Sequence, residues 1–282
     1  MKLLILGCGN AGLELAAQAK AKGWEVIGST TTPARVDEIE KVADKAVVLI
    51  GSDSAAVKAA AEGVDAIVVA VSPPAVRSAK KEDRGPIYEE VLVKSGASAA
   101  AACDRVVFMS SISVYGDGSQ EPGELLTEKT PRATDNGEPS TIYFAAGEDT
   151  VLAIPGGTVL RFPDMYGHPD DIEFADRVKL AHDHMGSSVP FDRADKYHPI
   201  HIEDVARATL LVLDKGLTGA YNVVPDEEPA PTVGDFWDKT ADKSGQERLE
   251  FRGEIRTPIQ QTSSAKLRAQ GFTFLHPVSE VV

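Results

Sequence analysis

Cysteine and long apolar runs are both scarce in this 282-residue sequence. The two cysteines, Cys8 and Cys103, are too few for a scaffold held by disulfide bonds, so we expect a reducing compartment and a cytoplasmic location. No apolar stretch approaches the roughly 20 residues that a bilayer-spanning helix needs. The opening segment superficially resembles a secretion signal, but its apolar run is only about four residues long before glycines and Glu14 follow. We therefore interpret this segment as a first strand.

Positive charge is also scarce. The sequence has 29 Lys and Arg against 43 Asp and Glu, which gives a net charge of −14 and a pI of about 4.9. Such a balance argues against nucleic acid or an anionic membrane as the main partner. The partner that we expect is a small-molecule substrate. Because 43% of the residues are hydrophobic, the chain can fill a sizeable core, and its length fits one large α/β unit with a satellite lobe.

Apolar runs alternate with helical segments along most of the chain, which is typical of βαβ units with a parallel sheet. We expect strands at residues 3–6, 24–28, 46–50, 66–71, 105–110 and 157–161. We expect helices at residues 13–22, 36–41, 55–62, 88–103, 145–153, 172–184 and 202–213. The segment 116–140 is rich in Gly, Pro and polar residues, so we expect an exposed loop over a site.

A glycine-rich turn stands between the first expected strand and the first expected helix. Gly7, Gly9 and Gly12 have the spacing GxGxxG, with Asn10 and Ala11 between the last two. The first glycine permits a tight turn, the second lets the backbone approach a phosphate, and the third lets the helix pack closely on its strand. Free N–H groups at the helix N-terminus then face the anion. We therefore expect a dinucleotide pyrophosphate here; the alternative is a turn without a ligand.

The end of the second expected strand indicates which dinucleotide binds. An NAD site usually has Asp or Glu there to bind the ribose hydroxyls. This chain has Thr30, Thr31 and Arg35 instead, and a guanidinium with hydroxyls suits the extra phosphate of NADP. We predict NADP, with NAD as the alternative cofactor. The other interpretation of these Ser and Thr residues is that they cap the helix that begins near Pro33.

These features predict a Rossmann fold, in which a doubly wound parallel sheet carries helices on both faces, with a smaller C-terminal substrate lobe. We assign residues 1–166 to a dinucleotide-binding domain, with 200–223 returning to it. We assign 167–199 and 224–282 to the small substrate-binding lobe. We also expect Asp53 and Val71 to line the cofactor site.

Five motifs follow one another along nearly the whole chain. They are the Gly7 loop, MSSISVYG at 109–116, LRFPDMYG at 160–167, HIEDV at 201–205 and SAKLRAQGF at 264–272. This ordered set resembles the extended short-chain dehydrogenase/reductases, which include nucleotide-sugar epimerases and dehydratases. The GCGNAG loop and the short chain are most similar to the atypical members of that family. The resemblance implies an NAD(P)-dependent oxidoreductase or epimerase, and relatives that dimerise suggest a homodimer through residues 87–102 and 145–153.

The resemblance implies two catalytic residues. Ser111, four residues before the tyrosine of VYG, would hydrogen-bond the substrate oxygen on which charge develops during hydride transfer. Its alternative role is to cap the turn after the strand. Tyr143 would be the tyrosine of the family's YxxxK pair, although it is alternatively a packed aromatic residue.

The sequence departs from the family at the lysine of that pair. Gly147 stands four residues after Tyr143, and no lysine occurs between Lys129 and Lys179. Without a cation one helical turn away, the pKa of the phenol should stay near its reference value of about 10, which weakens acid or base catalysis near pH 7. We expect position 147 to face the surface and to tolerate a lysine. A catalytically weakened NAD(P)-binding sensor is therefore the alternative function.

A second departure concerns the substrate. Relatives that bind nucleotide sugars commonly have an arginine four residues before the histidine of HxxD, and this chain has Tyr197 there, so a small carbonyl, hydroxyl or sugar-like substrate is expected. Lys196 and Arg193 are the alternative sources of the missing charge. His198, His201 and Asp204 belong to a segment that looks structural in the family, so we expect no metal site.

Overall fold

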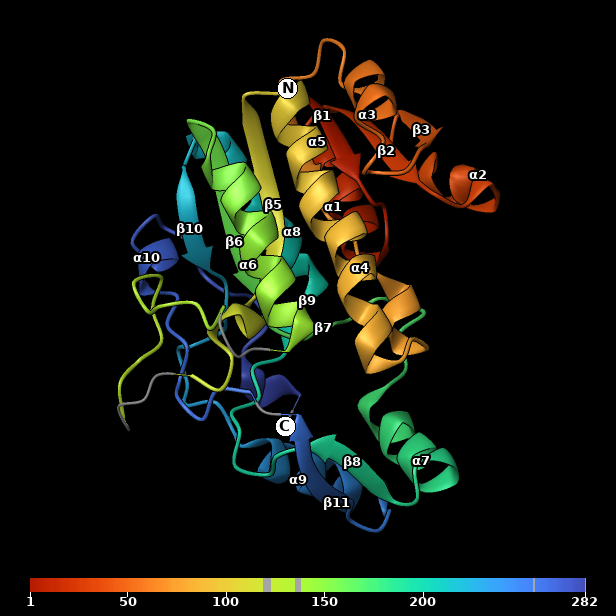
Figure 1. Ribbon diagram of the computed structural model, residues 1–282. Helices are drawn as coiled ribbons and strands as arrows, with labels where there is room; N and C mark the ends of the chain where they lie inside the picture. Colours follow the sequence, from red (N-terminus) through yellow and green to blue (C-terminus); the bar gives the residue numbers. More distant parts are fainter. Residues whose placement is uncertain (119–122, 135–137, 256, 282) are drawn as a thin grey trace.

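The computed structural model describes residues 1–118, 123–134, 138–255 and 257–281. Its largest element is a seven-stranded sheet in the order β10-β6-β5-β4-β1-β2-β3 (Figure 1). The strands of this sheet are β1 (Lys2–Leu6), β2 (Glu25–Thr30), β3 (Lys45–Val48), β4 (Ala66–Val69), β5 (Arg105–Ser111), β6 (Gly156–Phe162) and β10 (Gly219–Asn222). All neighbouring pairs are parallel. The predicted Rossmann fold class is confirmed, and the six predicted strands lie at or within two residues of their expected bounds.

Helices cover both faces of this sheet. One face carries α1 (Asn10–Ala21), α2 (Val36–Ile39), α8 (Ile202–Lys215) and α10 (Ala265–Arg268). The other carries α3 (Ser54–Ala60), α4 (Arg84–Tyr88), a π-helical turn (Glu89–Val93), α5 (Lys94–Ala102) and α6 (Pro139–Leu152). Short 3-10 turns are η1 (Pro33–Arg35), η2 (Pro74–Arg77), η3 (Lys81–Asp83), η5 (Ile112–Tyr115) and η6 (Val278–Glu280).

The alternation of side chains along each strand explains why helices cover both faces of the sheet. Leu3 and Ile5 of β1 pack into the core under α1 and α8, whereas Leu4 and Leu6 pack into the core under α3, α5 and α6. Successive side chains of a strand point to opposite faces, so a run of apolar residues is needed where both faces are covered. The continuous apolar runs of this sequence therefore fit a sheet that is buried on both sides.

The strand order reverses direction between β1 and β4. From β1 the chain builds outward through β2 to β3, and it then crosses back to place β4 on the other side of β1. In open α/β sheets, ligands bind in the crevice at the carboxyl ends of the strands at such a reversal. The glycine-rich turn after β1 and the loop after β4 both lie at this edge.

A smaller lobe lies beyond the carboxyl ends of the strands (Figure 1). Its apolar core is formed by α7 (Phe174–His184), β8 (Ser188–Phe191), α9 (Val233–Ser244) and β11 (Glu250–Ile255), and β8 pairs with β11 in parallel. A second parallel pair, β7 (Met165–Tyr166) with β9 (Ile200–His201), stands where the chain leaves and re-enters the main sheet. The C-terminal segment does not belong wholly to the lobe, because Leu267 and Phe272 pack into the core under α1 and α8.

The segment after Tyr115, which we expected to be an exposed loop, is also held to the rest of the protein by backbone hydrogen bonds. Leu126 is fully buried; its N–H donates to the Gln261 carbonyl at 3.0 Å, and its carbonyl accepts from the Ser263 N–H at 2.8 Å. Helix α6 already begins at Pro139, so the predicted loop ends slightly earlier than expected. Residues 119–122 and 135–137 of that loop lie outside the described residues.

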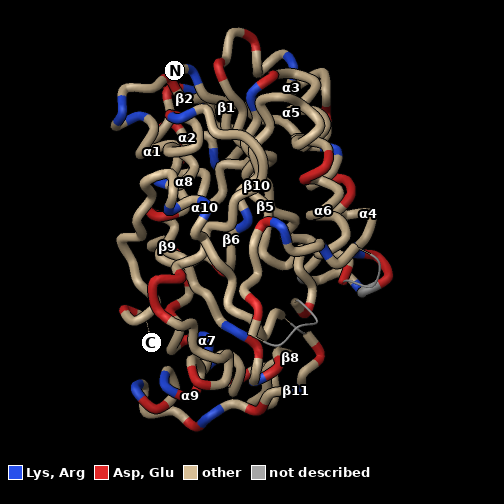
Figure 2. The backbone as a smooth tube through the Cα atoms, turned by 90° about the vertical axis from the view of Figure 1, so that its left-hand side faces the viewer, with Lys and Arg blue, Asp and Glu red and all other residues tan. Residues whose placement is uncertain are grey.

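Charges of both signs are interspersed along the backbone in the view of Figure 2, with no basic stripe on this side of the molecule. Among the described residues, no helix combines the length and the apolar character that crossing a membrane requires.

A buried ion pair connects α6 to the sheet. Glu148 and Arg161 have exposed fractions of 0% and 3%, and Arg161 donates to the two Glu148 oxygens at 2.9 and 2.7 Å. The Ser110 hydroxyl also donates to Glu148, at 2.7 Å. Arg161 Nη1 donates to the Tyr115 hydroxyl at 2.8 Å, and that hydroxyl donates to Asn222 Oδ1 at 2.7 Å. Burial opposes the charge of Arg161, but the hydrogen bonds and charge of Glu148 raise its pKa above the ordinary value.

We predict that Glu148→Ala lowers the free energy of unfolding by about 3–5 kcal/mol, because the buried Arg161 charge is then left without its partner. Urea denaturation followed by circular dichroism measures the loss. Asp149→Ala is the matched control, since the Asp149 side chain is 62% exposed and its pair with Arg132 should contribute at most about 1 kcal/mol. Equal losses for the two variants would contradict the assignment of Glu148 as the buried partner.

Candidate functional site

Each glycine of the turn after β1 has a different spatial requirement. Gly7 has a φ of +92°, and a Cβ there would lie 2.9 Å from the Ala70 carbonyl oxygen. A Cβ on Gly12 would lie 2.5 Å from the Gly7 carbonyl oxygen, so α1 could not pack as it does. A Cβ on Gly9 would meet nothing within 4 Å. Gly7 and Gly12 are thus required by the fold itself, whereas the space in front of Gly9 is open to a ligand.

Gly9 is also the N-cap residue of α1. No side chain caps this end of the helix, so the polar backbone at the N-terminus faces the open space. Asn10 and Ala11 form the first turn with Gly12, and Ala11 packs against the core under α1. The amide of Asn10 donates to Asp171 Oδ1 at 2.9 Å, which brings the segment after β7 against the turn. No sequence signal indicates this contact, because the two residues are 161 positions apart.

The hydroxyl residues at the end of β2 do not cap the next helix. Ser29 Oγ accepts from the Gly7 N–H at 3.0 Å, and Thr30 Oγ1 accepts from the Thr32 N–H at 3.1 Å. Thr32, the N-cap residue of η1, makes no side-chain capping bond. The Ser29 side chain therefore stabilises the glycine turn, and the Thr30 side chain stabilises the bend after β2. The exposed Thr31 lies at the surface of this bend.

Arg35 lies half-buried beside this bend and is paired with Glu38. Its Nε and Nη2 donate to the two Glu38 oxygens at 2.8 and 3.2 Å, which sequence reasoning missed although the residues are three apart. The thiol of Cys8 is buried nearby, and this burial raises its pKa to about 12, with Arg35 acting in the opposite direction. Cys8 is therefore a neutral packing residue at pH 7.

Asp53 and Val71 lie at the same edge of the sheet. Asp53 Oδ1 accepts from the N–H groups of Ala55 and Ala56 at 3.1 and 3.0 Å, so its carboxylate is the N-cap of α3. Val71, just after β4, contacts the glycine turn: its Cα is 3.0 Å from the position that a Cβ on Gly7 would take. Val71 borders the predicted cofactor site, and a ligand role for Asp53 stays a prediction.

Ser111 is the last residue of β5. Its Oγ accepts from the Ser113 N–H at 3.1 Å and so caps η5. A hydroxyl that accepts one bond still has a proton to donate, and the side chain is only half-buried. The capping role and the predicted substrate role are therefore compatible.

Tyr143 lies at the interface of α6 with α4. Its ring stacks on Tyr88, with 6.4 Å between ring centroids and 14° between planes. Its hydroxyl is 3.1 Å from the position that a Cβ on Gly85 would take. Another residue of α6, Thr141, makes a hydrogen bond to the turn after Ser111: its hydroxyl donates to the Ser113 carbonyl at 2.8 Å.

Gly147 does not face the surface, and our expectation for this position was wrong. It is buried, and a Cβ there would lie 2.8 Å from Cζ of Phe108 on β5. The helix approaches the sheet so closely at this point that a side chain has no room. The sequence pattern could not reveal this, because the close approach depends on a residue 39 positions earlier in the chain.

Tyr197 is packed among aromatic rings of the lobe. Its ring centroid is 4.4 Å from that of Phe236, and its hydroxyl donates to Asp164 at 3.4 Å. Burial and the Asp164 charge raise the pKa of this phenol well above 10, so it is neutral. The two cations suggested as substitutes are engaged elsewhere: Lys196 Nζ donates to the Ala230 carbonyl at 3.0 Å, and Arg193 pairs with Asp238 at 2.5 Å.

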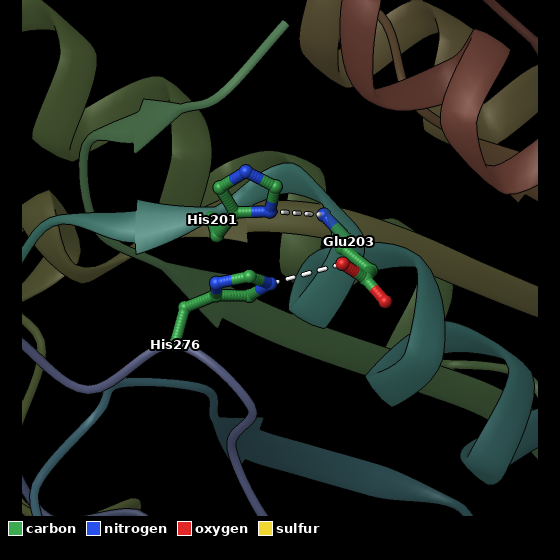
Figure 3. A group of neighbouring side chains, drawn as sticks. All are labelled: His201, Glu203 and His276. Carbon is green, nitrogen blue, oxygen red and sulfur yellow. Dashed lines mark hydrogen bonds and ion pairs between the residues drawn. The ribbon is translucent and has the colours of Figure 1, made fainter. Parts of the chain in front are cut away.

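Figure 3 shows His201 at the end of β9, Glu203 in the first turn of α8 and His276 on the C-terminal segment. These residues can offer three donor atoms within 4.8 Å of one another, which makes them a candidate metal group among the described residues. However, the His201 Nδ1 lone pair accepts the Glu203 N–H at 3.2 Å, and His276 Nε2 lies 2.9 Å from Glu203 Oε2. The two imidazole rings lie against each other, tilted by 30° with centroids 3.9 Å apart.

The neighbouring residues give this group a structural role. Asp204, which is fully buried, accepts the N–H groups of Leu275 and His276 at 3.0 Å. His201 caps α8, and Asp204 and Glu203 bind the C-terminal segment to that helix. His198 is separate from the group; burial lowers its pKa to about 4, so its ring is neutral at pH 7.

Comparison with known proteins gives a matching family and similar curated proteins. Residues 3–223 match the family described as the NAD dependent epimerase/dehydratase family. The chain is similar to Protein YeeZ of Escherichia coli, with 30% identity over 267 residues that cover 90% of this chain and 88% of YeeZ.

Solved structures share the fold over the whole chain. UDP-glucose 4-epimerase of Thermus thermophilus, in complex with NAD, has a TM-score of 0.78 and 23% identity, covering 100% of this chain and 96% of its own. A dTDP-glucose 4,6-dehydratase of Bacillus anthracis, also in complex with NAD, has a TM-score of 0.77 and 17% identity, covering 100% and 94%. At these identities the likeness concerns the fold.

We predict that Gly147→Lys lowers the free energy of unfolding by about 3 kcal/mol, because it overpacks the contact with Phe108 and buries a charge. Ala146→Lys, at the adjacent and less buried position of α6, is the matched control and should change stability by less than about 1 kcal/mol. Thermal and urea denaturation of both variants measure the difference. Equal stability of Gly147→Lys and the wild type would show that this face of α6 is open.

Proposed function

The chain belongs to the NAD dependent epimerase/dehydratase family, and from this membership we propose an NADP-dependent oxidoreductase or epimerase that acts on a small carbonyl, hydroxyl or sugar-like substrate. The observation that carries the proposal is the open space in front of Gly9, at the uncapped N-terminus of α1 and at the reversal of the strand order. Residues 1–166 and 200–223 would bind the cofactor, and the lobe would bind the substrate.

The residues at this edge fit a dinucleotide. The backbone of Gly9, Asn10 and Ala11 would face the pyrophosphate, as an anion at a helix N-terminus requires. Thr30, Thr31 and the Arg35 guanidinium would bind the 2′-phosphate of NADP. NAD stays the alternative, because the two similar epimerase and dehydratase structures contain NAD and because hydroxyls also suit a neutral ribose.

Ser111 would act on the substrate. A bound nicotinamide supplies or accepts the hydride. The Ser111 hydroxyl would donate to the substrate oxygen on which negative charge develops, and the Ser113 N–H fixes the Ser111 side chain for that purpose. Tyr143 is the proposed proton donor or acceptor on the family resemblance alone.

A second candidate function is a sensor that binds NAD(P) with weak or no catalysis. The observation in its favour is that Tyr143 packs on Tyr88 and next to Gly85, while a lysine has no room at Gly147. The two proposals share the cofactor site and differ in turnover. For both we propose the cytoplasm, in accord with the free thiols of Cys8 and Cys103.

Isothermal titration with NADPH and NADH tests the cofactor. We expect NADPH to bind more tightly, and Arg35→Ala to weaken NADPH by about tenfold or more, since a charge-assisted bond contributes about 1.5–3 kcal/mol. NADH affinity should change little. Gly9→Val is the second variant: it has room in the fold, so a folded protein that no longer binds either dinucleotide is expected. Equal affinities for NADPH and NADH in the wild type refute the role given to Arg35.

Cofactor consumption with a panel of aldehydes, ketones and 4-keto sugars tests catalysis. We expect Ser111→Ala to reduce turnover about 10²-fold or more, with NADPH affinity unchanged, because it removes a donor to the developing oxyanion. Tyr143→Phe should reduce turnover about 10²-fold or more if the phenol transfers the proton. A Tyr143→Phe variant as active as the wild type excludes that role. Tight NADPH binding with no turnover in the wild type supports the sensor.

A further inference from the structure

We infer that Glu38 tunes the cofactor preference of this protein, because its carboxylate competes with the 2′-phosphate of NADP for the Arg35 guanidinium. The inference rests on the proposed cofactor site and adds a residue outside the glycine turn that sets its specificity. Without the phosphate, the Glu38 carboxylate occupies the Arg35 N–H groups that the phosphate would bind.

The Arg35–Glu38 pair uses the binding mode that a phosphate would use. Two parallel N–H groups, Nε and Nη2, donate to the two carboxylate oxygens at 2.8 and 3.2 Å. A guanidinium presents this same fork to phosphate oxygens. A phosphate therefore either displaces Glu38 from the fork or binds the remaining N–H groups with a carboxylate close by.

Either outcome costs free energy, because Glu38 and the phosphate are both negatively charged. The Arg35 hydrogen bond lowers the pKa of Glu38, so the carboxylate is ionised at neutral pH. The two side chains are 33% and 39% exposed, which keeps their mutual attraction modest and exchangeable. Repulsion between the Glu38 carboxylate and a phosphate that carries up to two negative charges adds to the cost of displacement.

Glu38 has a lysine and an imidazole within reach once it leaves Arg35. It borders a groove of about 410 Å³ whose lining includes the carboxylates of Glu14 and Glu203 as well as Lys41 and His168. Lys41 and His168 already act on the Glu38 charge. A displaced carboxylate would keep the attraction of Lys41 against the repulsion of Glu14 and Glu203, so we expect Glu38 to reduce the preference for NADP without abolishing it.

A ribose without the 2′-phosphate carries no charge, so it does not compete with Glu38 for Arg35. NADH presents hydroxyls to the bend after β2, and the Arg35–Glu38 pair stays intact when it binds. Removal of the Glu38 charge should therefore strengthen the binding of 2′-phosphorylated ligands selectively.

The test is isothermal titration of the full chain at fixed ionic strength with two probes, adenosine 2′,5′-bisphosphate and adenosine 5′-monophosphate. We expect Glu38→Gln to bind the bisphosphate about fivefold more tightly than the wild type does, with the monophosphate within about twofold. Glu40→Gln is the matched control, because it removes the same charge from an exposed residue two positions away. It should leave both affinities within about twofold. Glu38→Ala is the second variant should Glu38→Gln fold poorly.

Arg35→Ala separates this inference from the cofactor proposal. If Arg35→Ala leaves the affinity for the bisphosphate unchanged, the proposed phosphate site fails, whatever Glu38 does. If Arg35→Ala weakens the bisphosphate while Glu38→Gln does not strengthen it, or strengthens the monophosphate equally, only the inference about Glu38 is overturned. In the Arg35→Ala background, Glu38→Gln should have at most half of its effect, because the fork for which the two anions compete is absent.

Discussion

The buried ion pair between Glu148 and Arg161 is the interaction on which the arrangement of the site depends. It connects α6 to β5 and β6, and through Tyr115 and Asn222 it reaches the turn after β5 and the edge strand β10. Ser110, which binds Glu148, is the residue directly before Ser111. A buried charge pair is tolerated only when its hydrogen bonds are satisfied, so the elements that provide those bonds have little freedom to shift. The position of the Ser111 hydroxyl is therefore set by this network through the neighbouring Ser110.

The close approach of α6 to the sheet has a chemical consequence. Gly147 lets the helix lie against Phe108, while the family resemblance would place a lysine there. The close packing of α6 on β5 therefore leaves no room in this chain for the lysine of the usual catalytic pair. Tyr143, which has no cation one turn away on its helix, stacks on Tyr88 instead. Any catalysis must rely on hydrogen bonding and on electrostatics from other elements.

Two arginines illustrate how burial decides the use of a charge. Arg161 is nearly inaccessible and bound by Glu148 and Tyr115, so its role is to order the interior. Arg35 is about one-third exposed and paired with a single carboxylate, which leaves it accessible from solvent. The same guanidinium chemistry thus serves structure in one place and, as proposed, selectivity in the other.

Local rules were sufficient for much of the protein. Apolar runs and the spacing of Gly7, Gly9 and Gly12 depend on backbone geometry and on residues within a few positions, so six strands of the main sheet, most of the helices before residue 216 and the glycine turn were predictable from sequence, whereas β10 and the lobe elements β8, α9 and β11 were not. The bounds differ most where packing overrides local preference, as at α6, which begins at Pro139 and not at residue 145. The HxxD segment was likewise interpretable, because a cap and its helix are neighbours in the chain.

Tertiary structure alone decided which side chains meet across the fold. The contact of Asn10 with Asp171, the burial of Gly147 against Phe108 and the stacking of His201 on His276 join residues between 39 and 161 positions apart. The Arg35–Glu38 pair is local, but whether it forms depends on how the bend after β2 turns. Sequence periodicity records which face of an element is buried, not what that face touches, because many packings bury the same apolar area and only the folded chain selects one.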